Sequence, residues 1–105
     1  MATLLYQGQP GTSSAAVFTA TTETMIYAAS VCNPTGGAVT LDVWLVPSGG
    51  SAVDATMVYK ANSVATNSQQ SLAYLINQAL AAGDAIHMAA SAATSLTVTM
   101  SGREV

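Results

Sequence analysis

His87 is the only histidine in the chain, and imidazole is the side chain with the widest chemical use near neutral pH. As a general base it would need a nucleophile and an orienting partner, and in a metal site it would need two or three further ligands. The sequence supplies no second histidine. We therefore expect His87 to be a strand residue facing solvent or an interface, with no catalytic or metal-binding role.

Cys32 is the only cysteine, so no disulfide can form within the chain. A reactive thiol needs a basic neighbour or a helix N-terminus to lower its pKa, and the sequence around Cys32 shows neither. We expect a buried, inert thiol.

The carboxylates are spread along the chain as Glu23, Asp42, Asp54, Asp84 and Glu104. This spacing lacks the facing pair that glycosidases use and the dense oxygen cluster that calcium requires. Asp54 and Asp84 lie in turn-like segments, where we expect their side chains to bind nearby amides. The sequence predicts no enzyme activity, no catalytic residue, no cofactor and no metal.

The glycine pairs at 36–37 and 49–50 lack the spacing of a phosphate-binding loop and are expected to form turns. Trp44 and the four tyrosines could stack on sugars if they were exposed together. Single aromatic residues in strands are more commonly core or interface anchors, which is the interpretation we favour.

The composition limits the partners of the protein. The 105 residues are 50% hydrophobic and 7% charged, with a net charge of −3. Lys60 and Arg103 are the only cationic side chains, so no basic patch for nucleic acid or an anionic membrane can form. A surface with so few charges is poorly protected against association, which favours a subunit of an assembly. We expect one domain over residues 1–105.

Strand patterns are frequent and are separated by Gly- and Pro-containing turns. The clearest alternation covers residues 39–46 and 96–101, followed by 25–32 and 85–90. The loop 33–37 is expected to join 25–32 to 39–46 as a hairpin, and the turn 92–95 is expected to pair the last two strands. Weaker strands are expected at 3–6, 15–19, 57–64 and 71–75.

These patterns predict an all-β fold, an antiparallel β-sandwich of immunoglobulin-like or jelly-roll type with about seven to eight strands. For the ambiguous segment 72–82 we favour a strand followed by a short helical turn over 77–82, ending at Gly83. The predicted core consists of Val39, Leu41, Val43, Leu45, Ile86, Met88, Leu96, Val98 and Met100.

The apolar N-terminal segment has two interpretations. It is followed by Gly8 and Pro10, and residues 1–11 could form an arm that lies along a neighbouring subunit. Leu4, Leu5 and Tyr6 would then be interface residues. In the other interpretation the segment is the first strand of its own sheet. Exposed edge strands are normally protected by Lys, Pro or other charges, which are scarce here, so we expect a homo-oligomer.

Residues 1–7 lack the features of a signal peptide, and residues 85–102 are too rich in Ser and Thr for a membrane span. We expect a protein made in a cytoplasm.

Segments 45–55, 79–86 and 96–105, together with 11–17 and 31–33, resemble small virion proteins of tailed bacteriophages. The chain departs from many of these relatives at residues 20–24, which replace a Pro-Ala-Gly-Lys-like turn.

The resemblance implies a sandwich without a cofactor, assembled in the host cytoplasm and located in the virion. It implies a non-enzymatic structural subunit, foremost a capsid decoration or cement protein that binds and stabilises the particle surface. The alternative is a neck, tail or tail-fibre component, including a receptor- or carbohydrate-binding module. Partners would be other copies of the chain, with a trimer slightly preferred, and the major capsid protein or other virion proteins.

Overall fold

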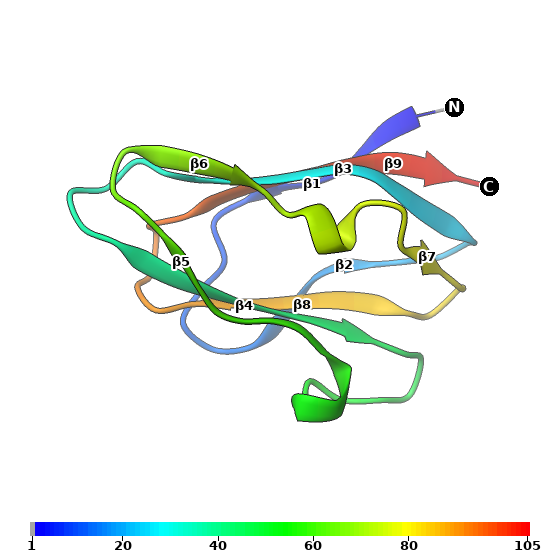
Figure 1. The fold of residues 1–105 in the computed structure, drawn as a ribbon. Helices are drawn as coiled ribbons and strands as arrows, with labels where there is room; N and C mark the ends of the chain where they lie inside the picture. The colour runs from blue at the N-terminus through cyan, green and yellow to red at the C-terminus, as the bar shows by residue number, and fades with distance from the viewer. Residues whose placement is uncertain (1) are drawn as a thin grey trace.

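Two antiparallel sheets pack face to face in the computed structural model, which describes residues 2–105 (Figure 1). The first sheet contains β1 (Ala2–Gly8), β9 (Thr97–Glu104), β3 (Thr24–Asn33), β6 (Ser68–Ser71) and the short β7 (Ala79–Leu80). The second sheet contains β2 (Ala15–Thr19), β8 (Ala85–Ala90), β4 (Val39–Val46) and β5 (Met57–Val64). Two 3₁₀ turns, η1 (Asp54–Thr56) and η2 (Ala73–Leu75), interrupt the later connections.

The strand pairing is nested from the ends of the chain inward. β1 pairs with β9, β2 with β8, β3 with β6 and β7, and β4 with β5. Both β6 and β7 lie along the same edge of β3, so they act as one interrupted strand. Eight strands nested in this way form a jelly roll. The predicted β-sandwich is confirmed, and of the two types expected the pairing is that of the jelly roll.

Both predicted hairpins are wrong. β3 lies in the first sheet and β4 in the second, so the loop 33–37 crosses between the sheets. β8 and β9 are likewise in different sheets. Turn residues mark where the chain reverses, but they do not determine whether the next strand pairs beside the last one or packs across the core from it.

The Asn33 side chain holds the crossing between β3 and β4. It is fully buried, and its Nδ2 donates to the carbonyl oxygens of Gly37 and Val64, each at 2.9 Å. Its Oδ1 accepts hydrogen bonds from the amide and the hydroxyl of Thr35, at 3.0 and 2.6 Å. One amide group therefore links the end of β3 to the loop and to the end of β5.

The predicted core residues lie between the two sheets. Eight of the nine are buried, and Leu45 is half-buried against the same cluster. The core also contains residues that the sequence patterns did not single out, chiefly from β3 and the segment after β6: Ile26, Ala29, Val31, Val64, Leu72, Leu75 and Leu80.

Strict alternation fails in β3 because the strand contains a bulge. Ile26 lies opposite Gly102 and Ala28 opposite Ser101, which leaves Tyr27 as an extra residue. Tyr27 and Ala28 therefore both point outward, and after them Ala29 and Val31 point into the core, where plain alternation from Ile26 would have placed Ala28 and Ser30.

Gly102 makes this bulge possible. A Cβ atom at this position would collide with the carbonyl oxygen of Met25 and would lie 3.0 Å from the Cα of Ile26. Only a residue without a side chain lets β9 approach β3 so closely.

The segment after β6 also differs from the prediction. The strand ends at Ser71, and the helical turn is η2 rather than a turn over 77–82. Leu72, directly before η2, and Leu75, its last residue, are both fully buried, and Asn77 then adopts a left-handed conformation with φ of 70°. The apolar spacing that suggested a helix thus reflects separate anchors of an irregular connection. Gly83, with φ of 94°, is a turn residue without a preceding helix.

We predict that Gly102→Ala lowers the free energy of unfolding by about 2–3 kcal/mol, because the added methyl group forces β9 away from β3. The matched control is Gly36→Ala, where a Cβ would meet nothing within 4 Å. This control should leave the stability unchanged or raise it slightly. Urea denaturation followed by circular dichroism measures both values, and equal stabilities of the two variants would contradict the proposed contact.

Asn33→Ala should cost about 2–4 kcal/mol, because it removes four hydrogen bonds, among them the buried bond to the Val64 carbonyl group. Asn33→Asp keeps Oδ1 but removes both Nδ2 donors, and it should be destabilised similarly. The control is Asn62→Ala, since the half-buried Asn62 amide makes one 3.2 Å bond to Gln70. If Asn62→Ala destabilises the protein as much as Asn33→Ala in the same denaturation experiment, the role assigned to Asn33 is wrong.

Candidate functional site

The outer face of the first sheet carries almost no charge. Its side chains stand in cross-strand rows fixed by the register: Gln7–Thr99–Ser30–Ser71, Leu4–Ser101–Ala28 and Ala2–Arg103–Met25–Ala79. Arg103 is the single charged residue in these rows. The face of an antiparallel sheet that is exposed to water normally carries polar and charged side chains. A face with a single charged residue in these rows is therefore unusual.

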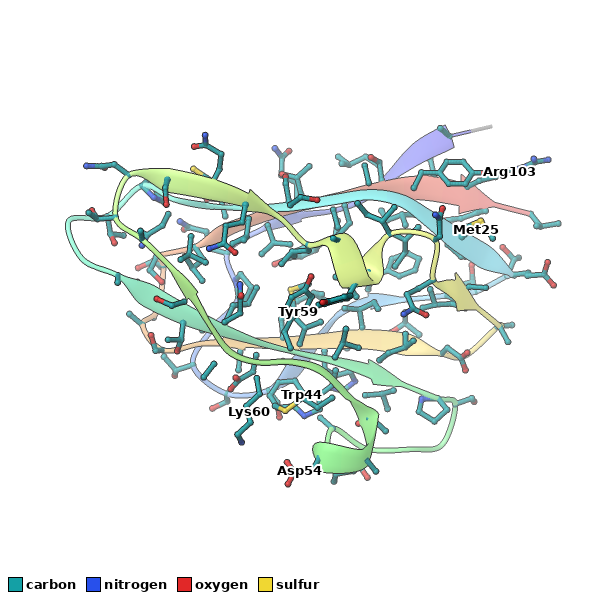
Figure 2. All side chains as sticks on the ribbon, in the orientation of Figure 1. Met25, Trp44, Asp54, Tyr59, Lys60 and Arg103 are labelled. Carbon is teal, nitrogen blue, oxygen red and sulfur yellow. The ribbon has the colours of Figure 1, made fainter. Side chains whose placement is uncertain are left out.

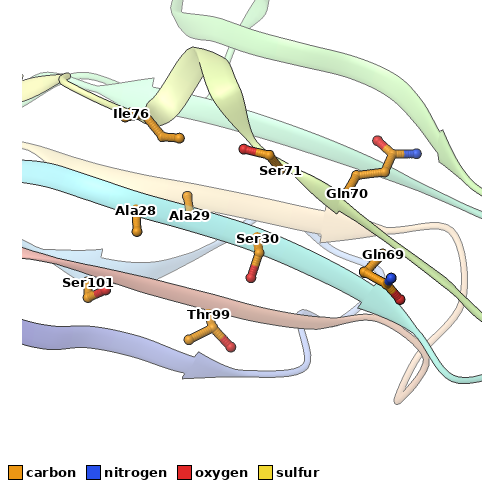
Figure 3. Close-up of a pocket in the computed structure, with 9 residues that line it drawn as sticks. All are labelled: Ala28, Ala29, Ser30, Gln69, Gln70, Ser71, Ile76, Thr99 and Ser101. Carbon is orange, nitrogen blue, oxygen red and sulfur yellow. The ribbon is translucent and has the colours of Figure 1, made fainter.

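A shallow cavity of about 350 Å³ lies in the middle of this face, where β6 leaves β3 (Figure 3). Small side chains line it, mainly Ala28, Ser30, Ser71, Thr99 and Ser101. Its lining contains hydroxyl and amide groups but no titratable side chain. The groups that line the cavity can form hydrogen bonds with a second molecule that packs flat against them. None of them is a general base that could activate the serines.

A second cavity of about 330 Å³ lies toward one end of the same sheet. Met25, Tyr27 and Val105 give it an apolar lining, and Glu23 and Arg103 contribute one charge of each sign. Figure 2 shows Met25 and Arg103 at the end of the molecule where both chain termini lie in Figure 1. Apolar and oppositely charged groups are therefore found together at this end.

His87 lies on the outer face of the second sheet, whereas both cavities lie on the first sheet. It is half-buried, opposite Trp44 of β4 and Ala16 of β2. Among residues 2–105 no group of three or more His, Cys, Asp or Glu side chains is arranged to hold a metal ion.

Trp44 is buried on the outer face of the second sheet. It forms a small cluster with Val46 and Ala89, against which Ala52 and Met57 pack. The segment after β4 therefore folds back over the sheet and covers the indole ring. This explains why the Asp42 side of β4 is partly apolar in sequence.

The tyrosines do not form a platform with Trp44. Tyr59 and Tyr74 pack at a ring-centroid distance of 5.5 Å at the β5 edge, and the Tyr59 hydroxyl accepts the Tyr74 amide at 3.0 Å. Tyr6 and Tyr27 belong to β1 and β3 of the other sheet. The arrangement that would favour sugar stacking, with Trp44 and the tyrosines exposed together, is absent from the described residues.

The predicted burial of Cys32 is wrong, because this residue is exposed. It stands on the outer face of the first sheet between Thr97 and Gln69. After the bulge at Tyr27, the positions of β3 that point inward are occupied by Ala29, Val31 and Asn33, which leaves Cys32 outside.

The prediction for Asp84 is confirmed. Its carboxylate accepts the amides of Ser48 and Ala81, each at 3.0 Å, and so ties two turns together. In the loop containing Asp54, the hydroxyl of Thr56 makes the local bonds, to the carbonyl groups of Ser51 and Val53.

The N-terminal segment is the first strand of its own sheet, where β1 pairs with β9. Of the three candidate interface residues, Leu4 is exposed, while Leu5 and Tyr6 are half-buried against the core. A register shift at Leu5 turns both Leu5 and Tyr6 toward the interior. Partial burial raises the pKa of the Tyr6 hydroxyl.

The sheet edges are protected by backbone irregularity instead of charge. Register shifts interrupt the edge strands β1, β2 and β5. In β5 the shift exposes the Ala61 amide, which donates to Asp42 Oδ1 at 2.6 Å. The edge of β6 is tied to β5 by Gln70, whose Nε2 donates to the Ser63 carbonyl at 2.7 Å. Irregular backbone therefore takes the place of the edge charges that the sequence lacks.

No helix in the described part of the chain is long and apolar enough to cross a membrane. Comparison with protein-family models, curated proteins and solved structures yields no significant match to this chain.

We predict that alkaline pH destabilises the protein partly through Tyr6. The pKa of Tyr6 is higher in the folded state than in the unfolded state, so the unfolded chain loses this proton first as the pH rises above about 10. Stability should then fall with increasing pH, and Tyr6→Phe should fall less steeply. Thermal unfolding between neutral and strongly alkaline pH tests this, and identical pH slopes for the two proteins would contradict it.

Proposed function

We propose that the chain is a non-enzymatic structural subunit of a bacteriophage virion, acting as a capsid decoration or cement protein that binds and stabilises the particle surface. The observation that carries this proposal is the outer face of the first sheet, whose cross-strand rows beside the Arg103 row consist mainly of Ala, Ser and Thr side chains without a charge. A face of small, weakly hydrated residues can lie flat against another protein at a low desolvation cost.

The strand pairing gives further support. Jelly rolls occur in viral capsid domains, although the same architecture also serves lectins and enzymes. The described residues hold no metal cluster, and the central cavity has no titratable lining that could run acid–base chemistry. Contact with other proteins needs only a flat surface of small side chains, which the outer face of the first sheet provides.

The proposed function predicts that the protein is found in purified phage particles in many copies. Particles from an infected host, banded by density and analysed by quantitative mass spectrometry, should contain it in a fixed ratio to the major capsid protein. Particles made without its gene should release their DNA at lower temperature, and adding the purified protein should restore the resistance.

The location in the particle separates the decoration role from its alternative. Electron microscopy of particles carrying a labelled copy should show the label distributed over the head. Label confined to the neck or tail would replace the decoration role with that of a tail component. Absence of the protein from the particles would contradict the virion proposal altogether.

A further inference from the structure

Exposed apolar side chains are concentrated at one end of the outer face of the first sheet. Six large hydrophobic side chains are exposed among residues 2–105, and four of them lie at this end: Leu4, Met25, Tyr27 and Val105. Arg103 stands among them, directly opposite Met25. We call these five residues the Arg103 patch. The other two exposed side chains, Val53 and Tyr74, lie outside this sheet.

The composition of the Arg103 patch matches the centre of a protein–protein interface. Tyr, Met and Arg are enriched at such centres and other charged residues are depleted. Single exposed apolar residues need no explanation, but a group of them around an arginine does. The neighbouring row contains only Ser101 and Ala28 besides Leu4, so the patch continues into a flat, uncharged surface.

The charges at the patch complement each other. Glu23 and Arg103 are both exposed and line the same cavity. A two-fold interface uses the same surface on both subunits, so it requires a patch that carries both members of each charge pair. Lys60, the only other cationic side chain, lies on β5 of the second sheet. With Glu23 at its border, the Arg103 patch is therefore the place on the first sheet where a second copy finds both apolar contact and an oppositely charged partner for Arg103.

We propose that two copies of this chain associate through the Arg103 patch about a two-fold axis, with Arg103 of each copy facing Glu23 of the partner subunit. The two copies contact each other through the faces of their sheets and not through strand pairing at the sheet edges. The register shift in β1 obstructs the addition of a further strand at that edge. It therefore differs from the expected trimer built with an N-terminal arm. The dimer is a property of the purified chain and does not depend on a role in a virion.

Sedimentation equilibrium tests the proposal directly. The wild-type protein should reach twice its monomer mass of 10.6 kDa as its concentration rises. Arg103→Glu and Glu23→Arg should each raise the dimer dissociation constant by about tenfold or more, because each places like charges opposite one another. An equimolar mixture of these two variants should recover the dimer, since their altered charges are complementary. Tyr27→Lys should also weaken the dimer.

Matched controls place the same kinds of change elsewhere. Val53→Lys and Tyr74→Lys introduce a charge at exposed apolar residues outside the patch, and Lys60→Glu reverses a charge on the other sheet. All three should dimerise like the wild type. Circular dichroism melting must show that every variant is folded. A wild-type protein that stays monomeric up to millimolar concentration, a mass of three subunits, or charge variants whose mixture remains monomeric would each overturn the proposal.

Discussion

The close approach of β9 to β3 at Gly102 is the contact on which the rest of the architecture depends. β9 is the last strand, yet it lies between β1 and β3 in the first sheet. Because Gly102 has no Cβ, its backbone can lie against the Met25 carbonyl, and β3 can carry Tyr27 as an extra residue. The bulge leaves both Tyr27 and Ala28 outward and turns Ala29 and Val31 into the core. The same contact thus completes the sheet and determines which later residues of β3 face the core.

A chain with 7% charged residues holds its loops mainly by bonding side chains to backbone groups. Asn33 binds the carbonyl groups of Gly37 and Val64, and Asp84 binds the amides of Ser48 and Ala81. In the loop that crosses from β3 to β4, the carbonyl group of Thr35 accepts a hydrogen bond from the hydroxyl of Thr66. Among the described residues, no buried side-chain nitrogen or oxygen lacks a hydrogen-bond partner. Such bonds satisfy the polar groups where strands leave one sheet for the other.

The sequence predicted the strands better than their partners. The strand patterns located β2, β4 and β5 at their observed bounds, and alternation identified core positions such as Leu41 and Val98. Alternation is a local property, however, and the choice of sheet depends on contacts between distant segments. For this reason the hairpins were wrongly predicted. The bulge at Tyr27, and with it the inward position of Ala29 and Val31, depends on Gly102, which lies far along the chain.

Contact between two copies through the Arg103 patch covers side chains at one end of the outer face of the first sheet, and the oxidation of those side chains can report it. Met25 and Tyr27 are exposed to 38% and 45% in the single chain, and Tyr74, outside the face, is exposed to 71%. Methionine and tyrosine are readily oxidised by hydroxyl radicals, so footprinting with mass spectrometry can follow all three at increasing protein concentration. The account predicts that oxidation of Met25 and Tyr27 falls as the concentration rises while that of Tyr74 stays constant. Unchanged oxidation of Met25 and Tyr27 over the whole range would contradict it.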